Sequence, residues 1–343
     1  MEILTITRPD DWHLHLRDGA AMQSIIRHTA RRFARAIIMP NLNPPVTTGE
    51  MAIAYRERIL SSLPPDSYFQ PLMTLYLTDN TSPDIIRKAR DSGVIFAVKY
   101  YPAGATTQSD NGVTDINKVL SVLAVMEEVR LPLLLHGEVT DAGVDIFERE
   151  QVFIERVLDP LLQRFTDLRV VLEHITTQQA VDYIRNGSER LAATITPQHL
   201  LLNRNALFAG GLRPHHYCLP VLKAEEHRRA VVTAATSGHP RFFLGTDSAP
   251  HARAEKESAC GCAGIYSAPA GIELYAEVFD RENSIDKLEA FASYNGADFY
   301  GLPRNTDRIT LEKSSWTIPA TLPFAGTEIV PFMAGEECHW QLT

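Results

Sequence analysis

The chain has 343 residues, with 33 Lys and Arg against 42 Asp and Glu, so its formal net charge is −9. This length suits one large α/β barrel or two ordinary domains, and 45% hydrophobic residues with only four cysteines exclude a disordered chain, a collagen and a disulfide scaffold. We expect no nucleic-acid or membrane binding and a cytoplasmic location, because the chain is acidic and shows neither a secretory signal nor an apolar run of about 18 residues.

Eight short apolar runs predict β-strands. Such continuously apolar strands favour a parallel sheet that is covered on both faces. In chain order the predicted strands are Trp12–Leu16, Ala36–Met39, Gln70–Leu77, Ile95–Tyr100, Leu131–His136, Arg169–His174, Leu191–Thr196 and Phe242–Asp247.

Amphipathic segments with apolar spacing near 3.6 residues separate these runs and predict helices. Before one of them, Ser82 is expected to cap a helix that starts at Pro83. The predicted helices are Met22–Phe33, Glu50–Leu60, Pro83–Asp91, Ile116–Val129, Val144–Phe165, Gln178–Arg185 and Glu225–Ser237.

The strand and helix patterns alternate about eight times, which predicts a (β/α)8 barrel over residues 10–300. A doubly wound sheet is the alternative, but it needs a Gly-rich turn after the first strand, and Leu16-Arg17-Asp18-Gly19 is not one. Residues 302–343 are rich in Thr and Pro, and we expect a C-terminal extension packed on a single barrel domain of residues 1–343.

The first predicted strand carries two histidines, His13 and His15. Side chains at i and i+2 of a strand point to the same face, so both imidazoles should face the barrel mouth. An exposed pair would be unremarkable, whereas two buried imidazoles side by side favour a bound metal.

Four later strands end in polar side chains, namely Lys99, His136, His174 and Asp247. Each one alone could be a satisfied polar group at a strand end. Together they gather at the carboxyl ends of the strands, where barrel enzymes build their active sites. With the two histidines they make six groups, more than the three protein ligands of a single catalytic zinc, which favours two metal ions.

Lys99 requires a special role, because an ammonium group cannot bind a cation. It could be a neutral ligand, a Schiff-base nucleophile or, after carboxylation by carbon dioxide, an anionic carbamate that bridges two metals. The residues themselves leave all three roles open.

Longer motifs surround these residues and resemble those of the shorter, bacterial-type (class II) dihydroorotases of the amidohydrolase superfamily. The resemblance extends from about residue 7 to residue 305. The motifs are Arg8-Pro9-Asp10-Asp11-Trp12-His13-Leu14-His15-Leu16-Arg17-Asp18-Gly19, Met39-Pro40-Asn41-Leu42, Lys99-Tyr100-Tyr101-Pro102, His136-Gly137-Glu138, Glu173-His174-Ile175-Thr176 and Gly245-Thr246-Asp247-Ser248-Ala249-Pro250-His251.

The resemblance implies a binuclear zinc site, a cytoplasmic homodimer and the reversible cyclisation of N-carbamoyl-L-aspartate to L-dihydroorotate, the third step of pyrimidine biosynthesis. Two zinc ions would be bridged by carboxylated Lys99 and by a hydroxide that acts as the nucleophile. Asp247 would serve as general base and then as general acid. The implied ligands are His13, His15 and Asp247 for the more buried ion, and His136 and His174 for the other.

A substrate carboxylate needs a cationic partner, and Arg17 lies two residues beyond His15, so it should point into the same mouth. An ordinary salt bridge to Asp18 or Asp10 is the alternative. The resemblance adds substrate contacts from Asn41, His251, Leu219 and Ala263, and a lid at Pro102–Gly112 whose Thr106 and Thr107 touch the substrate.

Three other possibilities bear on function. A hydantoinase or allantoinase would carry a β-sandwich built from both chain ends, and we expect no such half-domain here because His13 follows so soon after Met1. A non-catalytic barrel scaffold would tend to lose ligands, whereas all six positions are filled. Cys260 and Cys262 lack a second ligand pair, so we predict a loop near the substrate rather than a structural zinc site.

Overall fold

A computed structural model of the chain describes residues 2–259 and 261–343, so the prediction for Cys260 lies outside the described residues. Eight parallel strands form one sheet in the order of the sequence. They are β2 (Asp10–Leu14), β3 (Arg35–Ile38), β4 (Gln70–Tyr76), β5 (Ile95–Tyr100), β6 (Leu133–His136), β7 (Val170–Glu173), β8 (Leu191–Ile195) and β9 (Phe242–Leu244).

The last strand returns to the first and closes the sheet. Beyond β9, the Asp247 amide donates to the His13 carbonyl at 2.9 Å, and the His15 amide donates to the Ser248 carbonyl at 3.2 Å. Leu14 and Ser248 form a parallel bridge at the same point. The predicted (β/α)8 barrel is confirmed, although the first strand begins and ends two residues earlier than predicted, so that His15 lies just beyond it.

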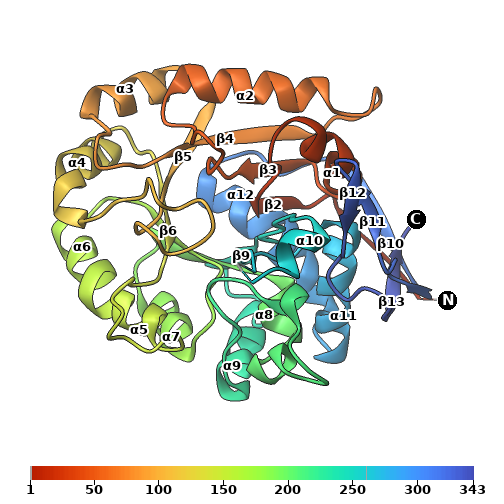
Figure 1. Ribbon diagram of the computed structural model, residues 1–343. Coiled ribbons are helices and arrows are strands. Elements are labelled where there is room, and N and C mark those ends of the chain that lie inside the picture. Colours follow the sequence, from red (N-terminus) through yellow and green to blue (C-terminus); the bar gives the residue numbers. More distant parts are fainter. Residues whose placement is uncertain (1, 260) are drawn as a thin grey trace.

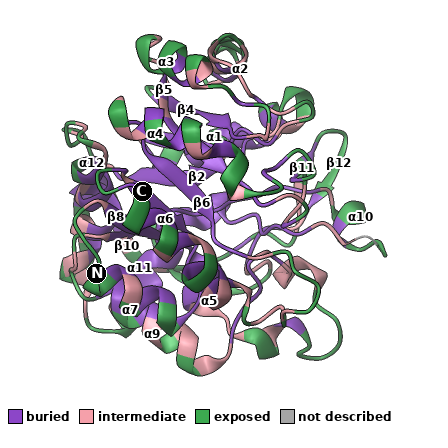
Figure 2. Ribbon diagram, turned by 90° about the vertical axis from the view of Figure 1, so that its left-hand side faces the viewer, coloured by how far each residue is buried: buried purple, intermediate pink, exposed green. Residues whose placement is uncertain are grey.

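Helices lie around the outside of the barrel (Figure 1). Figure 2 shows that buried residues concentrate on the strands, while exposed residues lie on the outer faces of the helices. The helices are α1 (Gly19–Arg32), α2 (Gly49–Ser61), α3 (Pro83–Asp91), α4 (Leu120–Glu128), α5 (Arg149–Phe153), α6 (Asp159–Arg164), α7 (Gln178–Asn186), α8 (Pro197–Leu201), α9 (Glu225–Ala235), α10 (Arg253–Lys256), α11 (Gly271–Arg281) and α12 (Asn295–Tyr300). No described helix combines the length and the apolar content that a membrane crossing requires.

Local sequence explains where several helices begin and change. The Ser82 side chain accepts from the Ile85 amide, and α3 has the predicted bounds. The prediction of one helix over Val144–Phe165 is wrong at its start, because helical structure begins only at Arg149. A π-helical turn at Ile154–Leu158 follows, next to Pro160, which has no N–H to donate to the helix.

The barrel interior below the strand ends is apolar. Trp12 stacks on Tyr300 with ring centroids 4.6 Å apart, and Phe243 contacts the edge of the Trp12 ring. Trp12 and Phe243 belong to a buried cluster against which Tyr300 packs and to which every barrel strand contributes: Trp12, Ile37, Met39, Leu72, Ala97, Leu134, Val171, Ala192, Phe243, Ala297 and Phe299. This cluster fills the amino-terminal half of the barrel, so that an open pocket can form only at the carboxyl ends.

Both chain ends contribute to a smaller sheet beside the barrel, seen next to the N and C labels in Figure 1. Strand β1 (Ile3–Thr7) pairs with β10 (Arg308–Thr317), which pairs with β13 (Glu337–Leu342), and β11 (Leu322–Phe324) forms a hairpin with β12 (Thr327–Ile329). Strand β1 is not among the strands predicted from the sequence. The Trp340 indole donates to Asp280 of α11 at 3.3 Å, which links this sheet to the barrel helices.

Candidate active site

A pocket lies at the carboxyl ends of the strands. Most of the predicted site residues line it: His13, His15, Arg17, Asn41, Thr106, Thr107, His136, His174, Leu219, Asp247 and Ala263. Lys99 is fully buried behind the lining, and His251 contacts Arg17. Residues that are up to about 250 positions apart in the chain therefore meet in one place.

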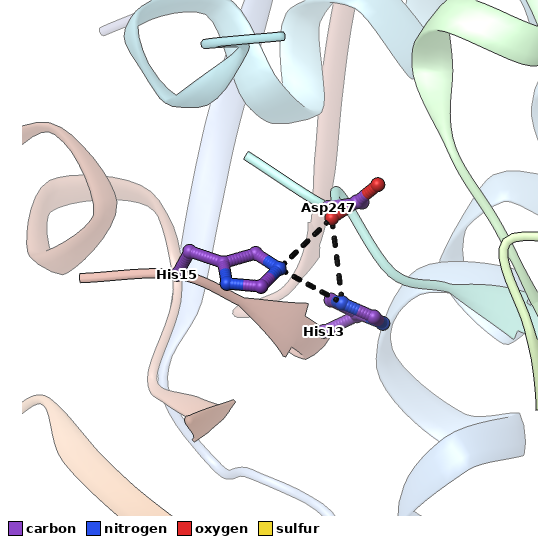
Figure 3. A group of neighbouring side chains, drawn as sticks. All are labelled: His13, His15 and Asp247. Atoms are coloured by element: carbon purple, nitrogen blue, oxygen red, sulfur yellow. Dashed lines mark hydrogen bonds and ion pairs between the residues drawn. The ribbon is translucent and has the colours of Figure 1, made fainter. Parts of the chain in front are cut away.

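The three ligands predicted for the more buried ion face one another (Figure 3). His13 Nε2 and His15 Nε2 are 3.3 Å apart, and they lie 3.3 Å and 3.2 Å from Asp247 Oδ1. His15 Nδ1 contacts Asn41 Oδ1 at 2.9 Å, so its proton belongs on Nδ1 and its Nε2 carries a lone pair. Lone pairs and a carboxylate that converge in a buried place repel one another unless a cation lies between them, so these residues fit a metal ion.

Several site residues have a backbone conformation that non-glycine residues rarely adopt. Arg17, His174 and Asp247 have φ values of 58°, 44° and 45°. Each of them follows the end of a strand, where a left-handed residue turns the side chain into the barrel mouth. Such strain is expected where the surrounding structure holds residues in place for function.

Glu173 lies in the middle of the site, although the sequence analysis gave it no role. Its Oε1 lies 3.1 Å from His13 Nδ1, and its Oε2 contacts Lys99 Nζ. His13, Glu173 and His174 form a second group that could hold a metal. A carboxylate that faces the outer nitrogen of a metal-binding histidine usually orients that ring. The strand pattern could have revealed Glu173, because it is two residues beyond the inward-facing Val171.

The second pair of predicted histidines is adjacent but not equivalent. The rings of His136 and His174 have centroids 4.9 Å apart. His136 Nε2 contacts Glu138 Oε2 at 2.8 Å, whereas His174 Nδ1 is buried without a hydrogen-bond partner among the described residues. A buried ring nitrogen without a hydrogen-bond partner is available to a ligand.

Burial controls the charge of the site. It lowers the pKa of His15 to about 4 and lowers that of His174 as well, so both imidazoles are neutral near pH 7. Burial also lowers the pKa of Lys99, against the opposing effect of Glu173. For Asp247 burial acts in the opposite direction, but His13 and His15 outweigh it and hold the pKa at about 2. Neutral imidazoles with an ionised carboxylate are the protonation states that metal binding requires.

Of the predicted carboxylate-binding residues, Arg17 and Asn41 line the pocket, and His251 lies against Arg17. Arg17 donates from Nε to the Pro250 carbonyl at 2.9 Å, and its Nη2 lies 2.9 Å from His251 Nε2. No ion pair joins Arg17 to Asp18 or Asp10, which instead pair with Arg58 and Arg35. Two of its five N–H donors are thus directed to the protein, and the others can bind a ligand.

The loop that carries Thr106 and Thr107 reaches across the pocket. Thr107 Oγ1 donates to the Ala263 carbonyl at 3.3 Å, and the Thr107 carbonyl lies 3.5 Å from Asn41 Nδ2. His251 Nε2 lies 3.1 Å from the same Ala263 carbonyl. The loop after β5 therefore meets the segment after β9 beside the candidate metal-binding groups.

Comparison with known proteins agrees with this geometry. The sequence profile of the amidohydrolase family matches residues 6–332. The chain is 64% identical over 339 residues to the dihydroorotase of Methylobacillus flagellatus, covering 99% of this chain and 98% of that protein.

Two solved dihydroorotase structures superpose closely. That from Campylobacter jejuni has a TM-score of 0.91 at 36% identity and covers 99% of this chain and 97% of its own. That from Saccharomyces cerevisiae, in complex with 5-fluoroorotic acid, has a TM-score of 0.90 at 33% identity and covers 100% and 99%.

The barrel, its polar mouth and the family profile define an amidohydrolase, and the chain belongs to the amidohydrolase family. Identity above 60% over nearly the full length of both chains places it, within that family, among the dihydroorotases. Proteins of this family use a metal cofactor, in agreement with the buried groups of histidine and carboxylate ligands.

Proposed function

We propose that this chain is a dihydroorotase, an enzyme that interconverts N-carbamoyl-L-aspartate with L-dihydroorotate and water in pyrimidine biosynthesis. The main support for the proposal is that one pocket contains both a group of residues that could bind a metal (His13, His15 and Asp247) and the side chains of Arg17 and Asn41. A set of metal ligands alone would suit many hydrolases. The guanidinium of Arg17 in the same pocket suits a cyclic amide that carries a carboxylate.

Two zinc ions are the proposed cofactor. His13, His15 and Asp247 would hold one ion, and His136 and His174 the other, with Lys99 between them. Bound zinc lowers the pKa of a water ligand and polarises a carbonyl oxygen, which makes water a nucleophile and an amide an electrophile near pH 7.

Carboxylation of Lys99 would make it an anionic ligand. The neutral amine adds to carbon dioxide, forms an N–C bond and releases one proton. Burial lowers the pKa of Lys99, which favours the neutral amine. Lys99 Nζ contacts Glu173 in this structure, so carboxylation would require the lysine to leave that carboxylate.

Asp247 is the proposed general base and general acid. Its Oδ1 faces the two histidine Nε2 atoms at the floor of the pocket, where the reacting amide would lie. As an ionised carboxylate it can accept the proton of the nucleophile, hold it on an oxygen and deliver it to the leaving ring nitrogen in hydrolysis.

The substrate carboxylate would bind the free donors of Arg17, with Asn41 and His251 beside it. The backbone of Leu219 and Ala263 would contact the ring, and Thr106 and Thr107 would cover it as a lid that excludes water. The single domain of residues 1–343 with an extension at 302–343, the homodimer and the cytoplasmic location stay predictions.

Purified protein loaded with zinc tests the proposal. We expect turnover of dihydroorotate and cyclisation of N-carbamoyl-L-aspartate, little turnover of hydantoin or allantoin, and close to two zinc per chain. Arg17→Met should raise KM for dihydroorotate about tenfold or more while zinc content stays unchanged. Turnover of hydantoin without turnover of dihydroorotate would overturn the proposal, and a metal-free, inactive protein would support the scaffold alternative.

A further inference from the structure

One buried lysine near the pocket has no role in the function proposed above. Lys256, at the end of α10, is only 4% exposed, yet its ammonium group contacts three backbone carbonyl groups. Its Nζ donates to Tyr217 at 2.8 Å, to Cys262 at 3.0 Å and to Gly264 at 2.5 Å. Each of the three ammonium N–H groups therefore has one carbonyl acceptor.

The three carbonyls belong to two chain segments that both line the pocket. Tyr217 precedes Leu219 by two residues, and Cys262 and Gly264 flank Ala263. The segments also touch directly, because the Gly264 amide donates to the Tyr217 carbonyl at 3.1 Å. Lys256 thus ties together the two pieces of backbone that the proposed function places against the substrate ring.

Peptide planarity gives this contact a consequence inside the pocket. The Cys262 carbonyl points at Lys256, so the N–H of the same peptide unit, that of Ala263, points the opposite way. Within the described residues no protein group accepts that N–H. Ala263 lines the pocket, so its amide is free to donate to a substrate oxygen.

A buried ammonium group is costly to retain. Burial lowers the pKa of Lys256 to about 8. No described carboxylate forms an ion pair with it, so the three carbonyls, together with the Tyr217 ring whose centroid lies 5.9 Å from Nζ, offset the loss of water. An apolar side chain of similar length would fill the same space without this cost, which indicates that the two segments need the three donors.

We propose that Lys256 is a positioning residue for substrate binding: it orients the segments around Leu219 and Ala263 so that the Ala263 amide faces the substrate. It touches neither the substrate nor the metal-binding groups, and it acts only through the backbone that it holds. This inference rests on the proposed dihydroorotase function.

The test compares Lys256→Met with two other variants. Lys256→Met should raise KM for dihydroorotate about tenfold, change kcat less than threefold and leave the zinc content unchanged. Lys256→Arg keeps the charge and the donors and should restore KM to within threefold of the wild type. Lys223→Met is the matched control, since Lys223 is 3% exposed and donates to one carbonyl, that of Val221, at 3.0 Å. We expect its KM to stay within twofold.

A second measurement covers the case in which Lys256→Met is too unstable for kinetics. Hydrogen exchange of the Gly264 amide, which donates to the Tyr217 carbonyl, requires no turnover. It should be faster in Lys256→Met than in the wild type, and close to the wild-type rate in Lys256→Arg and Lys223→Met. An unchanged KM in Lys256→Met, an equal rise in Lys223→Met, or a loss of kcat without a change in KM would overturn the positioning role. Wild-type protein that fails to turn over dihydroorotate would instead overturn the proposed function, so the two failures are distinguishable.

Discussion

The two halves of the barrel interior are built from the same strands but have opposite chemistry. On β5, β6 and β7 the inward residues Ala97, Leu134 and Val171 belong to the apolar cluster. Two positions further along each strand, and therefore on the same face, lie Lys99, His136 and Glu173. A distance of two residues, about 7 Å along a strand, separates the packed core from the candidate catalytic centre.

The difference shows how stability and function are divided. The apolar half has close-packed rings, and its cluster of described residues contains no charged side chain. The polar half brings bare nitrogen lone pairs, carboxylates and left-handed backbone together. Without a metal these features cost stability, so the lower half has to supply the stability that the upper half lacks.

The largest expected effect comes from replacing aspartate with asparagine at the two ends of the barrel interior: Asp247 at the carboxyl ends of the strands and Asp10 at the amino-terminal end of β2. Asp247→Asn removes the proposed general acid and base, so kcat should fall about 10²–10⁴-fold. The melting temperature of the metal-free variant should fall, but by less than that of Asp10→Asn, because the low pKa of Asp247 means that its ionised carboxylate stabilises the folded protein. Steady-state kinetics and calorimetry measure both quantities.

Asp10→Asn is the matched control at the amino-terminal end of β2. Asp10 is fully buried and forms a two-pronged contact with Arg35, at 2.9 Å and 2.5 Å. Weakening this pair should lower the free energy of unfolding by up to about 3–5 kcal/mol and leave kcat nearly unchanged. A variant at either end that impairs stability and kcat equally would break the division between the two halves.

The packing of the apolar half can be tested at Gly296 in α12. A Cβ atom there would lie 2.0 Å from Trp12 Nε1, and Trp12 cannot move aside because it is stacked on Tyr300. Gly296→Ala should therefore destabilise the fold by about 1–3 kcal/mol, measured by chemical unfolding.

Gly49→Ala provides the control for that substitution. Its Cβ atom would meet nothing closer than Ala89 Cα at 4.0 Å. Stability should be unchanged or slightly higher, since alanine restricts the unfolded chain. Equal effects of the two substitutions would contradict the idea that close packing around Trp12 stabilises the barrel.

The sequence predicted the barrel well because its strands are short, apolar and regularly spaced. The bounds of β5 and α3 agree residue for residue with the prediction. Strand β1 was not predicted, because Ile3–Thr7 has five residues and its partner β10 lies about 300 residues away in the chain. Such a pairing depends on tertiary contacts that local patterns do not contain.

His174 and Glu173 show a second limit of prediction from strand periodicity. His174 was predicted as the end of a strand whose side chains alternate, but alternation alone would turn it away from the barrel. Its φ of 44° turns it inward, and Glu173 keeps the inward position that alternation assigns. Backbone strain of this kind cannot be predicted from periodicity.

Glu173 also supplies the smallest effect that we expect to measure. Glu173→Gln keeps the shape of the side chain but removes the charge that faces His13 Nδ1 at 3.1 Å. Losing an outer partner of this kind usually weakens metal binding about 10–100-fold, and we expect the lower end because glutamine can still accept from the ring. Zinc affinity, measured by competition with a chelator, tests this without relying on turnover.

Glu273→Gln is the control, since Glu273 is equally buried but pairs with Arg32 far from any predicted ligand. Its zinc affinity should match the wild type. Equal zinc affinity in all three proteins would show that Glu173 only balances the charge of Lys99. Zinc affinity would then depend on the predicted ligands and not on the carboxylate behind His13.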